Sequence, residues 1–259
     1  MLPVFCQIKA NSNSTMKLTV KNSLATALAI AGTAAFSSTA GAAVVYDETF
    51  ETYALGDSSG QGLWVDFGGA QLSNVVNTIA NGGTQSLALS TSPGYGSDTT
   101  IDLAAPITSG QLQLSFDIYQ PTGFDGNAHI FLSRGATLGG VFDEGFHLFG
   151  DGTAGTFFDT GSPTTPLLLD QWVPVIVNID LDADTANASY GGTEIFNGVW
   201  NNGGTAPTQF QGVNIWAAEG QAVSTYNIDN FKLETVPEPS GVALLGLGFA
   251  GLVLRRRRA

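Results

Sequence analysis

The stretch QLQLSFDIY, residues 111–119, alternates apolar and polar residues with a period of two. In an extended chain successive side chains point to opposite faces, so this stretch has one apolar face and one polar face. A second stretch, WVPVIVNID at residues 172–180, repeats the pattern and is followed by a polar turn at residues 182–185. Together they predict half-buried β-strands. The apolar positions are Leu112, Leu114, Phe116, Ile118, Val173, Val175, Val177 and Ile179.

Shorter apolar or alternating runs, separated by turn residues, recur on both sides of these two stretches. No helical periodicity persists for a dozen residues between the two termini. We therefore predict an all-β domain over residues 44–235, built as a two-sheet sandwich. Its further strands are expected at residues 44–50, 63–67, 72–79, 86–90, 99–103, 128–133, 145–149, 155–158, 186–190, 194–196, 210–216 and 226–234.

Charge is divided unevenly along the chain. Between Ala43 and Val236 the only basic residues are Arg134 and Lys232, against 21 of the 22 acidic residues, which gives a net charge of −19. A surface of this sign repels phosphate backbones, which argues against nucleic acid as a partner, and it offers oxygen ligands to calcium. The only cysteine, Cys6, lies in a segment that we expect to be removed. The mature domain is then without disulfides, cysteine nucleophiles and thiolate metal sites.

Residues 16–43 have the features of a secretory signal peptide. Lys17 and Lys21 supply a positive start, residues 24–36 form an apolar stretch, and AGA at residues 40–42 is a small-residue cleavage pattern. We expect a signal helix here and cleavage by signal peptidase after residue 42 or 43. Residues 1–15 add nothing to such a signal, and we hypothesise that they are a mis-called extension ahead of a start at Met16.

The C-terminal residues 236–259 combine a proline motif, an apolar run and a cluster of arginines. The 14 apolar residues at 241–254 would form a helix of about 21 Å, short for a hydrocarbon core of about 30 Å. The arginines would stay in the cytoplasm and leave the acidic domain outside. We therefore expect a short transmembrane helix that acts as a weak stop-transfer element.

This order of Val-Pro-Glu-Pro-Ser, apolar span and terminal arginines resembles the PEP-CTERM sorting signal of Gram-negative bacteria that make exopolysaccharide. The resemblance implies an exosortase as processing partner, and a chain that is exported through the inner membrane and displayed on the surface or released. A plain single-pass anchor without processing stays the alternative. By resemblance, the recognition motif is Pro237, Glu238 and Pro239, and the retention signal is Arg255, Arg256, Arg257 and Arg258.

The domain itself resembles known jelly rolls in two places. QWVPVIVNIDLDADTANASYGGT, residues 171–193, is similar to the central hairpin of concanavalin-A-like and laminin-G-like jelly rolls. FETYALGDSSGQGLW, residues 50–64, and YNIDNFKLE, residues 226–234, resemble the first and last strands of exported bacterial carbohydrate modules. This second resemblance implies that the first and last strands lie together and share a structural calcium ion, held by Glu51 and Asp229, with Asp47, Glu48 and Asn230 nearby. The alternative is a solvated Glu51 and an Asp229 that caps a turn.

Other patterns that could support chemistry are weaker. Asp180, Asp182 and Asp184 lack the glycine and the bidentate glutamate of an EF-hand loop, which favours a hairpin turn. The two histidines, His129 and His147, lie in strand-like runs and do not define a metal site. The E-x-D-x-x-E pattern of concanavalin-A-like glucanases is absent, as are nucleophile-elbow and phosphate-loop motifs. The scarcity of basic residues argues against a polysaccharide lyase.

Aromatic residues are candidates for stacking on sugar rings. Trp172 and Trp216 lie in strand-like runs, so we expect them in the core. Trp200 and Tyr95 lie in glycine-rich loops, where binding residues gather, and we predict them as ligand-binding residues, with loop anchoring as the alternative for each.

The sequence thus favours an exported, non-catalytic jelly-roll protein associated with extracellular polysaccharide. Two alternatives stay open. One is a secreted glycan-processing enzyme of the same fold, a hydrolase or a lyase, and the other is a purely structural matrix protein.

Overall fold

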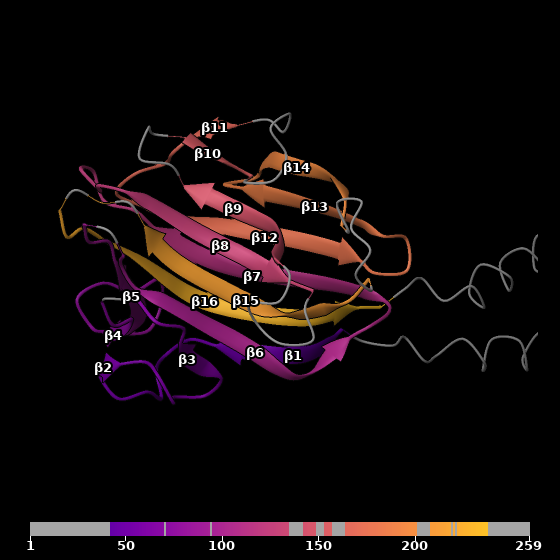
Figure 1. Ribbon diagram of the computed structural model, residues 1–259, viewed down its shortest axis with the longest axis horizontal. Coiled ribbons are helices and arrows are strands. Elements are labelled where there is room, and N and C mark those ends of the chain that lie inside the picture. Colours follow the sequence, from indigo (N-terminus) through magenta and orange to yellow (C-terminus); the bar gives the residue numbers. More distant parts are fainter. Residues whose placement is uncertain are drawn as a thin grey trace, which may run out of the picture. The chain divides into compact units, whose positions relative to one another are not determined.

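The computed structural model describes residues 42–69, 71–93, 95–134, 142–148, 153–156, 164–200, 208–218, 220 and 222–237, and in this part of the chain every regular element is a strand (Figure 1). The strands are β1 (Ala43–Glu48), β2 (Gly56–Asp57), β3 (Trp64–Asp66), β4 (Asn74–Val76), β5 (Ser86–Ser90), β6 (Asp98–Ile107), β7 (Gln111–Tyr119), β8 (Asn127–Ser133), β9 (Phe142–Leu148), β10 (Thr153–Thr156), β11 (Thr165–Pro166), β12 (Trp172–Asp180), β13 (Thr185–Tyr190), β14 (Thr193–Val199), β15 (Phe210–Ala218) and β16 (Thr225–Val236).

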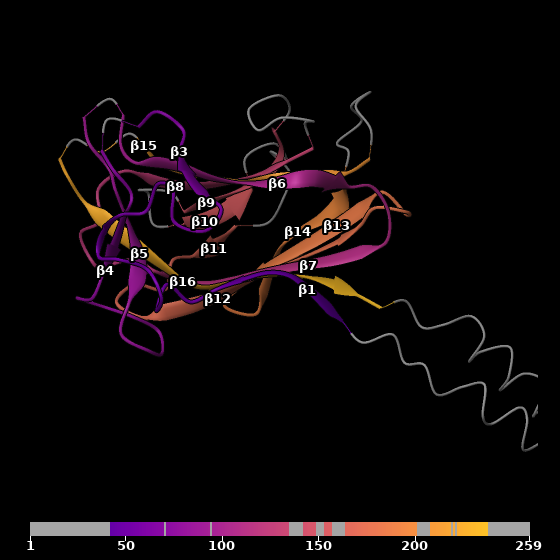
Figure 2. The same cartoon turned by 90° about the horizontal axis from the view of Figure 1, so that it is seen from below.

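The strands form two antiparallel sheets within one compact unit, Ala40–Glu238. The nine-stranded sheet has the order β14-β13-β12-β7-β16-β5-β4-β2, with β1 also paired to β16. The seven-stranded sheet has the order β11-β10-β9-β8-β15-β6-β3. Figure 2 shows the sheets as two stacked layers. The predicted all-β, two-sheet sandwich is confirmed for the described residues.

The hydrophobic core lies between the two layers. The apolar positions predicted for the two opening stretches are all buried, because every second side chain of β7 and β12 points to the same side. The seven-stranded sheet contributes Ala128, Ile130 and Leu132 from β8 and Val213, Ile215 and Ala217 from β15. At one end Phe50, Trp64, Phe116 and Phe231 pack together, with ring centroids 5.5 to 6.0 Å apart.

The first and last strands of the domain lie side by side. β1 pairs antiparallel with β16, with Ala43 opposite Thr235 and Glu48 opposite Phe231. On its other side β16 pairs with β7 over nearly its whole length. The last strand is therefore a central strand, and both ends of the domain leave the sheet at the same place.

Most predicted strands are present, and the differences are local. The two-residue strands β2 and β11 were not predicted, because two residues carry no periodicity. β9 and β10 each begin a few residues earlier than predicted. The turn after β12 is confirmed, since Asp180 Oδ1 accepts hydrogen bonds from the backbone N–H groups of Asp182 and Ala183.

The predicted terminal helices, the signal helix at residues 16–43 and the membrane helix at residues 241–254, fall essentially outside the described residues. Within the described ranges, the structure contains no helix of the length and hydrophobicity that a membrane span requires. The sorting residues Glu238, Pro239 and Arg255 to Arg258 also lie outside the described part, which ends at Pro237 directly after β16.

Candidate functional site

The outer face of the seven-stranded sheet, turned away from the core, gathers aromatic and polar side chains. Along β8 and β15 the core residues Ile130 and Ile215 alternate with outward residues. In the register of the sheet, Trp216 lies opposite Asp98 of β6 on one side and opposite His129 of β8 on the other. Three neighbouring strands therefore place an indole, a carboxylate and an imidazole in one row.

Four rings on this face form a continuous strip, which we call the aromatic strip. Tyr95 lies against Trp216 with ring centroids 5.4 Å apart, Trp216 stacks on His129 at 5.0 Å, and His129 stacks on Phe131 at 5.8 Å. His129 and Phe131 are buried, whereas Tyr95 is 44% exposed and Trp216 is partly exposed. A ligand in solution can therefore reach the strip at its Tyr95–Trp216 end.

Asp98 is the carboxylate beside this open end, and it is only 4% exposed. It accepts hydrogen bonds from the Asn214 side-chain amide and from the Tyr95 hydroxyl, the latter at 3.3 Å. Burial raises the pKa of Asp98, and the charge of Asp66 raises it further. A group that can donate to this carboxylate or carry a positive charge beside it would be stabilised here.

The other titratable groups of the strip are in their neutral forms at neutral pH. Burial and the charge of Asp98 raise the pKa of Tyr95, so its phenol stays protonated. Burial lowers the pKa of His129 to about 4, so its imidazole carries no charge. Among the described residues, the strip thus offers apolar ring faces next to the buried carboxylate of Asp98, an arrangement that suits ring stacking better than proton abstraction.

The tryptophans exchange the roles expected from the sequence. Trp200 was predicted as a ligand-binding residue, but its side chain is 0% exposed, and its indole N–H donates to the Gln209 carbonyl at 3.2 Å. Trp200 is therefore a core residue. Trp172 and Trp216, expected in the core, point outward because they alternate with core residues. Trp172 pairs with Tyr119 at 5.6 Å on the outer face of the nine-stranded sheet.

The two predicted calcium ligands, Glu51 and Asp229, are brought together by the loop between β4 and β5. Glu51 Oε1 accepts hydrogen bonds from the backbone N–H groups of Thr84 and Gln85, both at 2.8 Å. Asp229 Oδ2 accepts one from the backbone N–H of Asn81 at 2.7 Å. Gly83 has a φ of 60°, which favours glycine, and a Cβ there would meet the Glu51 carboxylate at 2.3 Å and displace it.

Backbone strain lies next to both carboxylates. Phe50, directly before Glu51, has a φ of 63°, and Asn230, directly after Asp229, has a φ of 52°. Such angles are uncommon for non-glycine residues and concentrate at functional sites. Asn230 also lies where the register of β16 against β7 shifts, and this bulge re-aims the side chains around it.

Two carboxylates that repel each other lie at this loop. All four of their oxygens accept hydrogen bonds, those of Glu51 from Thr84 and Gln85 and those of Asp229 from Asn81 and Asn230. Asp229 is buried, and burial together with the carboxylates of Glu51 and Asp117 raises its pKa to about 6. The described residues contain no group of three histidine, cysteine or acidic side chains positioned to hold a metal. Calcium takes six to eight oxygens, so Glu51 and Asp229 would supply two ligands, with backbone carbonyls and water supplying the others.

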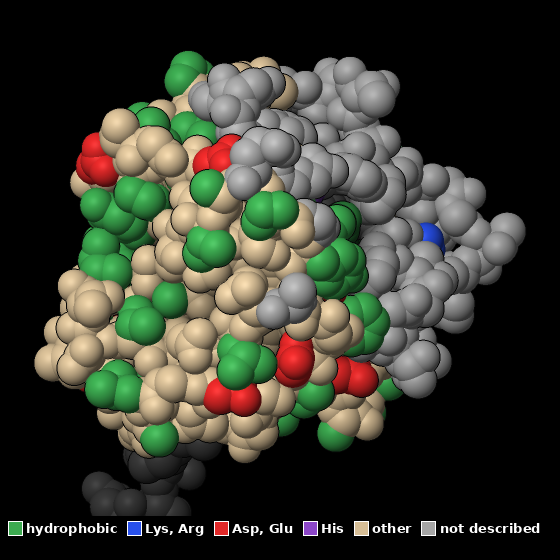
Figure 3. All heavy atoms as spheres, turned by 60° about the vertical axis from the view of Figure 1, so that its left-hand side comes forward, with side chains coloured by type: hydrophobic (Ala, Val, Ile, Leu, Met, Phe, Trp, Pro, Cys, Tyr) green, Lys and Arg blue, Asp and Glu red, His purple; other side chains and the backbone are tan. Residues whose placement is uncertain are grey.

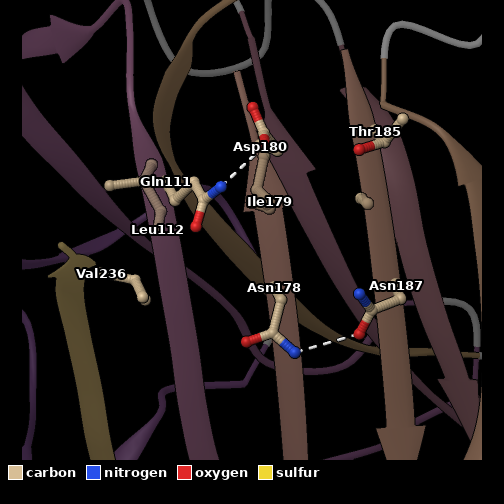
Figure 4. A pocket seen from close by; sticks show the side chains of 9 residues that line it. Gln111, Leu112, Asn178, Ile179, Asp180, Thr185, Asn187 and Val236 are labelled. Carbon is tan, nitrogen blue, oxygen red and sulfur yellow. Dashed lines mark hydrogen bonds between the residues drawn. The ribbon is translucent and has the colours of Figure 1, made fainter. Parts of the chain in front are cut away.

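A second surface lies on the outer face of the nine-stranded sheet. A pocket of about 280 Å³ there is lined mainly by polar side chains from β7, β12 and β13 (Figure 4). Gln111 donates to Asp180 at 2.9 Å, and Asn178 donates to Asn187 at 3.0 Å. These groups largely satisfy one another and include no aromatic ring, so the pocket offers a ligand less than the aromatic strip does.

The view in Figure 3 shows the distribution of side-chain types over one face. Acidic side chains are scattered among polar ones, hydrophobic side chains form small separate groups, and basic side chains are almost absent from the described part of this face. This matches the two basic residues between Ala43 and Val236.

Comparisons with solved structures place this fold in a recognisable class. A sialidase matches with a TM-score of 0.58 at 10% identity, over 74% of this chain and 18% of its own. The catalytic domain of a glycoside hydrolase family 131 protein from Coprinopsis cinerea matches with a TM-score of 0.52 at 14% sequence identity, over 75% of this chain and 95% of that domain. An alginate lyase in complex with an alginate trisaccharide matches with a TM-score of 0.52 at 14% sequence identity, over 73% of this chain and 97% of the lyase chain. The chain thus has the fold of jelly-roll domains found among carbohydrate-active proteins, and it spans less than a fifth of the sialidase.

The sequence comparisons identify the tail. Residues 235–258 match the PEP-CTERM protein-sorting motif, as predicted from Pro237 and its neighbours. The chain therefore carries a PEP-CTERM sorting motif, which indicates an exported protein that is sorted to the cell envelope or surface and implies processing by an exosortase. No curated protein sequence matches the chain.

Proposed function

We propose that this protein is a surface or extracellular-matrix β-sandwich that binds extracellular polysaccharide through the open end of the aromatic strip and does not catalyse its breakdown. The observation that carries the proposal is the Tyr95 ring, 44% exposed and held against Trp216 at 5.4 Å. Sugar rings present apolar C–H faces, and a rigid aromatic pair stacks on such faces at little entropic cost. The names of the solved structures with this fold, a sialidase, a glycoside hydrolase and an alginate lyase, support a glycan as ligand.

The chemistry of the strip supports binding without catalysis. A lyase needs a base and a cation that neutralises the substrate carboxylate, but the Tyr95 phenol stays protonated, and among the described residues the charge beside the strip is that of Asp98. Hydrolysis needs a proton donor and a second carboxylate at a defined separation, and the described residues of the strip supply the carboxyl group of Asp98.

One observation favours a glycan hydrolase as the second candidate. Asp98 is buried with a raised pKa, which is the property of a general acid, and Asp66 is close enough to influence it. In this alternative Asp98 would protonate the leaving group. The second carboxylate would have to come from elsewhere, because Asp66 lies opposite Thr99 and so on the other side of the sheet from Asp98. A purely structural matrix protein would show no affinity for glycans.

The test uses the exported protein as isolated from its host, purified in a mild detergent, on a glycan array with parallel assays for reducing ends and unsaturated uronates. We expect binding without new chain ends, and a loss of affinity of about tenfold or more in Tyr95→Ala. Trp172→Ala, which removes an outward ring from the other sheet, is the matched control and should keep the affinity. New reducing ends that disappear in Asp98→Asn would establish the hydrolase instead.

We also propose that calcium binds at Glu51 and Asp229. The raised pKa of Asp229 and the strained residues beside both carboxylates support this site. A cation that binds only the folded state stabilises it, so millimolar calcium should raise the melting temperature relative to a chelator. The Glu51→Ala/Asp229→Ala variant should lose this rise, whereas Asp182→Ala, in the β12–β13 turn, should keep it. An equal rise of the melting temperature in the wild type, the double variant and Asp182→Ala would show that the cation binds elsewhere.

A further inference from the structure

A groove of about 640 Å³ lies on the outer face of the nine-stranded sheet, the sheet that does not carry the aromatic strip. Its floor is formed by β5 and β16, which lie side by side next to β4 (Figure 1). Thr225 and Asn227 of β16 point outward here, because Tyr226 between them belongs to the core. In the register of the two strands they lie opposite Ser90 and Ala88 of β5. Among the described residues that line this groove, none is charged.

Asn227 offers a ligand a hydrogen-bond acceptor that the fold already orients. Its side chain is 6% exposed, and its Nδ2 donates to the Ser86 hydroxyl at 3.1 Å. The Ser86 hydroxyl donates its own proton to the Ile79 carbonyl at 2.6 Å, so it can only accept from Asn227, and this fixes the orientation of the Asn227 amide. The Asn227 Oδ1 accepts no hydrogen bond from the described residues and is left for a ligand.

A hydrogen-bond donor lies beside this acceptor. The hydroxyl groups of Ser90 and Thr225 share one hydrogen bond of 2.8 Å, in which one donates and the other accepts. The accepting hydroxyl keeps a proton that no acceptor among the described residues takes, so it can donate to a ligand. Thr225 and Asn227 are two residues apart on one strand, which separates donor and acceptor by about 6.6 Å. This separation is close to the span of a single pyranose ring.

We propose that this groove is a second sugar-binding site, which takes one uncharged sugar unit of a polysaccharide. Sugar hydroxyls both donate and accept, so one ring can bond to the Asn227 Oδ1 and to the Ser90–Thr225 pair. Leu55, which is 55% exposed, and Val76 line the same groove and offer apolar contacts to the C–H groups of the ring. A charged sugar would lose water here without gaining an opposite charge, so the groove favours a neutral one.

A peptide strand fits this groove less well. β5 lies between β4 and β16, and β16 lies between β5 and β7. The backbone groups of the floor are therefore already paired, and the floor has no free strand edge to which a peptide could add.

The position of the groove suggests a bridging role, which rests on the proposed function of the aromatic strip. The two sites lie on the outer faces of the two stacked layers and so face in opposite directions (Figure 2). One molecule with both sites would hold two polymer strands together.

The test removes the aromatic strip first and measures the binding that is left. The Tyr95→Ala protein, isolated from its host in mild detergent, is titrated with neutral hexamers of glucose, mannose and galactose and with a mannuronate hexamer, followed by ligand-observed NMR. We expect at least one neutral hexamer to bind with a Kd of about 1 mM, because no aromatic ring stacks on it. The mannuronate hexamer should not bind.

Further substitutions in the Tyr95→Ala protein locate this binding. Ser90→Ala/Thr225→Val removes both hydroxyl groups of the groove and should weaken binding about threefold to tenfold. Thr185→Val/Ser189→Ala removes the same two groups from the outer face of β13 and should leave the affinity unchanged. No binding of a neutral hexamer, or equal affinity in the two combined variants, would overturn the proposed groove site.

Comparison with the wild type separates the two sites. If Tyr95→Ala alone abolishes all binding, the groove site fails and the proposed function stands. If Tyr95→Ala binds as tightly as the wild type while Ser90→Ala/Thr225→Val does not, the proposed function fails and the groove site stands. For bridging, light scattering should show that the wild type cross-links a long polymer of the bound sugar, whereas Tyr95→Ala and Ser90→Ala/Thr225→Val do not. Cross-linking by either variant would overturn the bridging role.

Discussion

The carboxyl group of Asp229 makes the stability of the folded domain depend on pH. Its folded-state pKa is raised to about 6 from an ordinary value of 3.8, so between these values the folded protein holds a proton that the unfolded chain releases. The stabilisation from this proton is complete below about pH 4 and is lost as the pH rises through about 6.

In the absence of calcium we therefore expect the free energy of unfolding to include a contribution from Asp229 that falls by about 1 to 2 kcal/mol between pH 4 and pH 7. Urea titrations across this range, on the wild type and on Asp229→Asn, measure it. The variant has no proton to lose at this position, so its stability should vary less with pH. Identical pH profiles for the two proteins would contradict the raised pKa.

Among Trp172, Trp200 and Trp216, the buried Trp200 should contribute most to the stability of the domain. Its ring packs against Phe210 at 6.3 Å and its indole N–H is hydrogen-bonded, so Trp200→Ala removes a large side chain and leaves a cavity. We expect a loss of about 3 to 5 kcal/mol in unfolding free energy, measured by urea denaturation. Trp172→Ala, on the outer face, should cost about 1 kcal/mol. A similar loss in both variants would show that Trp200 is not a core residue in solution.

The roles of the tryptophans were predictable in part. In β12 the apolar face of Val173, Val175 and Val177 already required Trp172 to point the other way, and Val213 and Ile215 required the same of Trp216. An expectation based on residue type alone missed this alternation. The burial of Trp200 depends on contacts with Phe210 and Gln209, ten and nine residues further along the chain, which no local pattern contains.

At the scale of elements, the periodic strands were predictable and the irregular ones were not. β7 and β12 follow the two-residue alternation over nine residues each, and the structure pairs them directly. The pairing of the first strand with the last followed from resemblance, since no local rule brings Ala43 to Thr235. The aromatic strip was missed as a unit, because Tyr95, Trp216 and His129 meet only through the register of three strands. Tyr95 was selected for its loop position, and its glycan contact stays a prediction.

The pairing of β1 with β16 should depend on a few positions. Tyr46 lies opposite Leu233 and packs against Phe231 at 6.1 Å, so Tyr46→Pro removes the ring contact and places a proline inside the pairing of β1 with β16. We expect a loss of about 2 to 3 kcal/mol in thermal or urea unfolding. Val45→Pro is the control, because Val45 lies at the register shift between Val44 and Tyr46, where proline is tolerated. Equal losses would show that β1 contributes as a whole and not through Tyr46.

At the scale of the whole molecule, the sorting motif predicts a shortened mature chain. The apolar run between the Pro-Glu-Pro motif and the arginines would form a helix of about 21 Å, which is short for a bilayer, while the arginines fix the orientation of the chain. Such a segment suits a chain that is held in the membrane only until it is processed. We expect the mature protein to lack residues 241–259, with cleavage that requires Pro237, Glu238 and Pro239 and a host exosortase. Intact-mass spectrometry of protein from its host measures this. A mature chain that still ends at Ala259 in the presence of the enzyme would leave the plain membrane anchor.

The central position of β16 has a mechanical consequence. Pro237 follows this strand directly, so any pull on the C-terminal attachment is transmitted along β16 without an intervening linker. β16 is hydrogen-bonded to β7 on one side and to β1 and β5 on the other. Tension along the axis of β16 loads these hydrogen-bond ladders in shear. Many backbone hydrogen bonds then resist the force together and do not break one after another. A domain that is pulled through its last strand is therefore built to stay folded under tension.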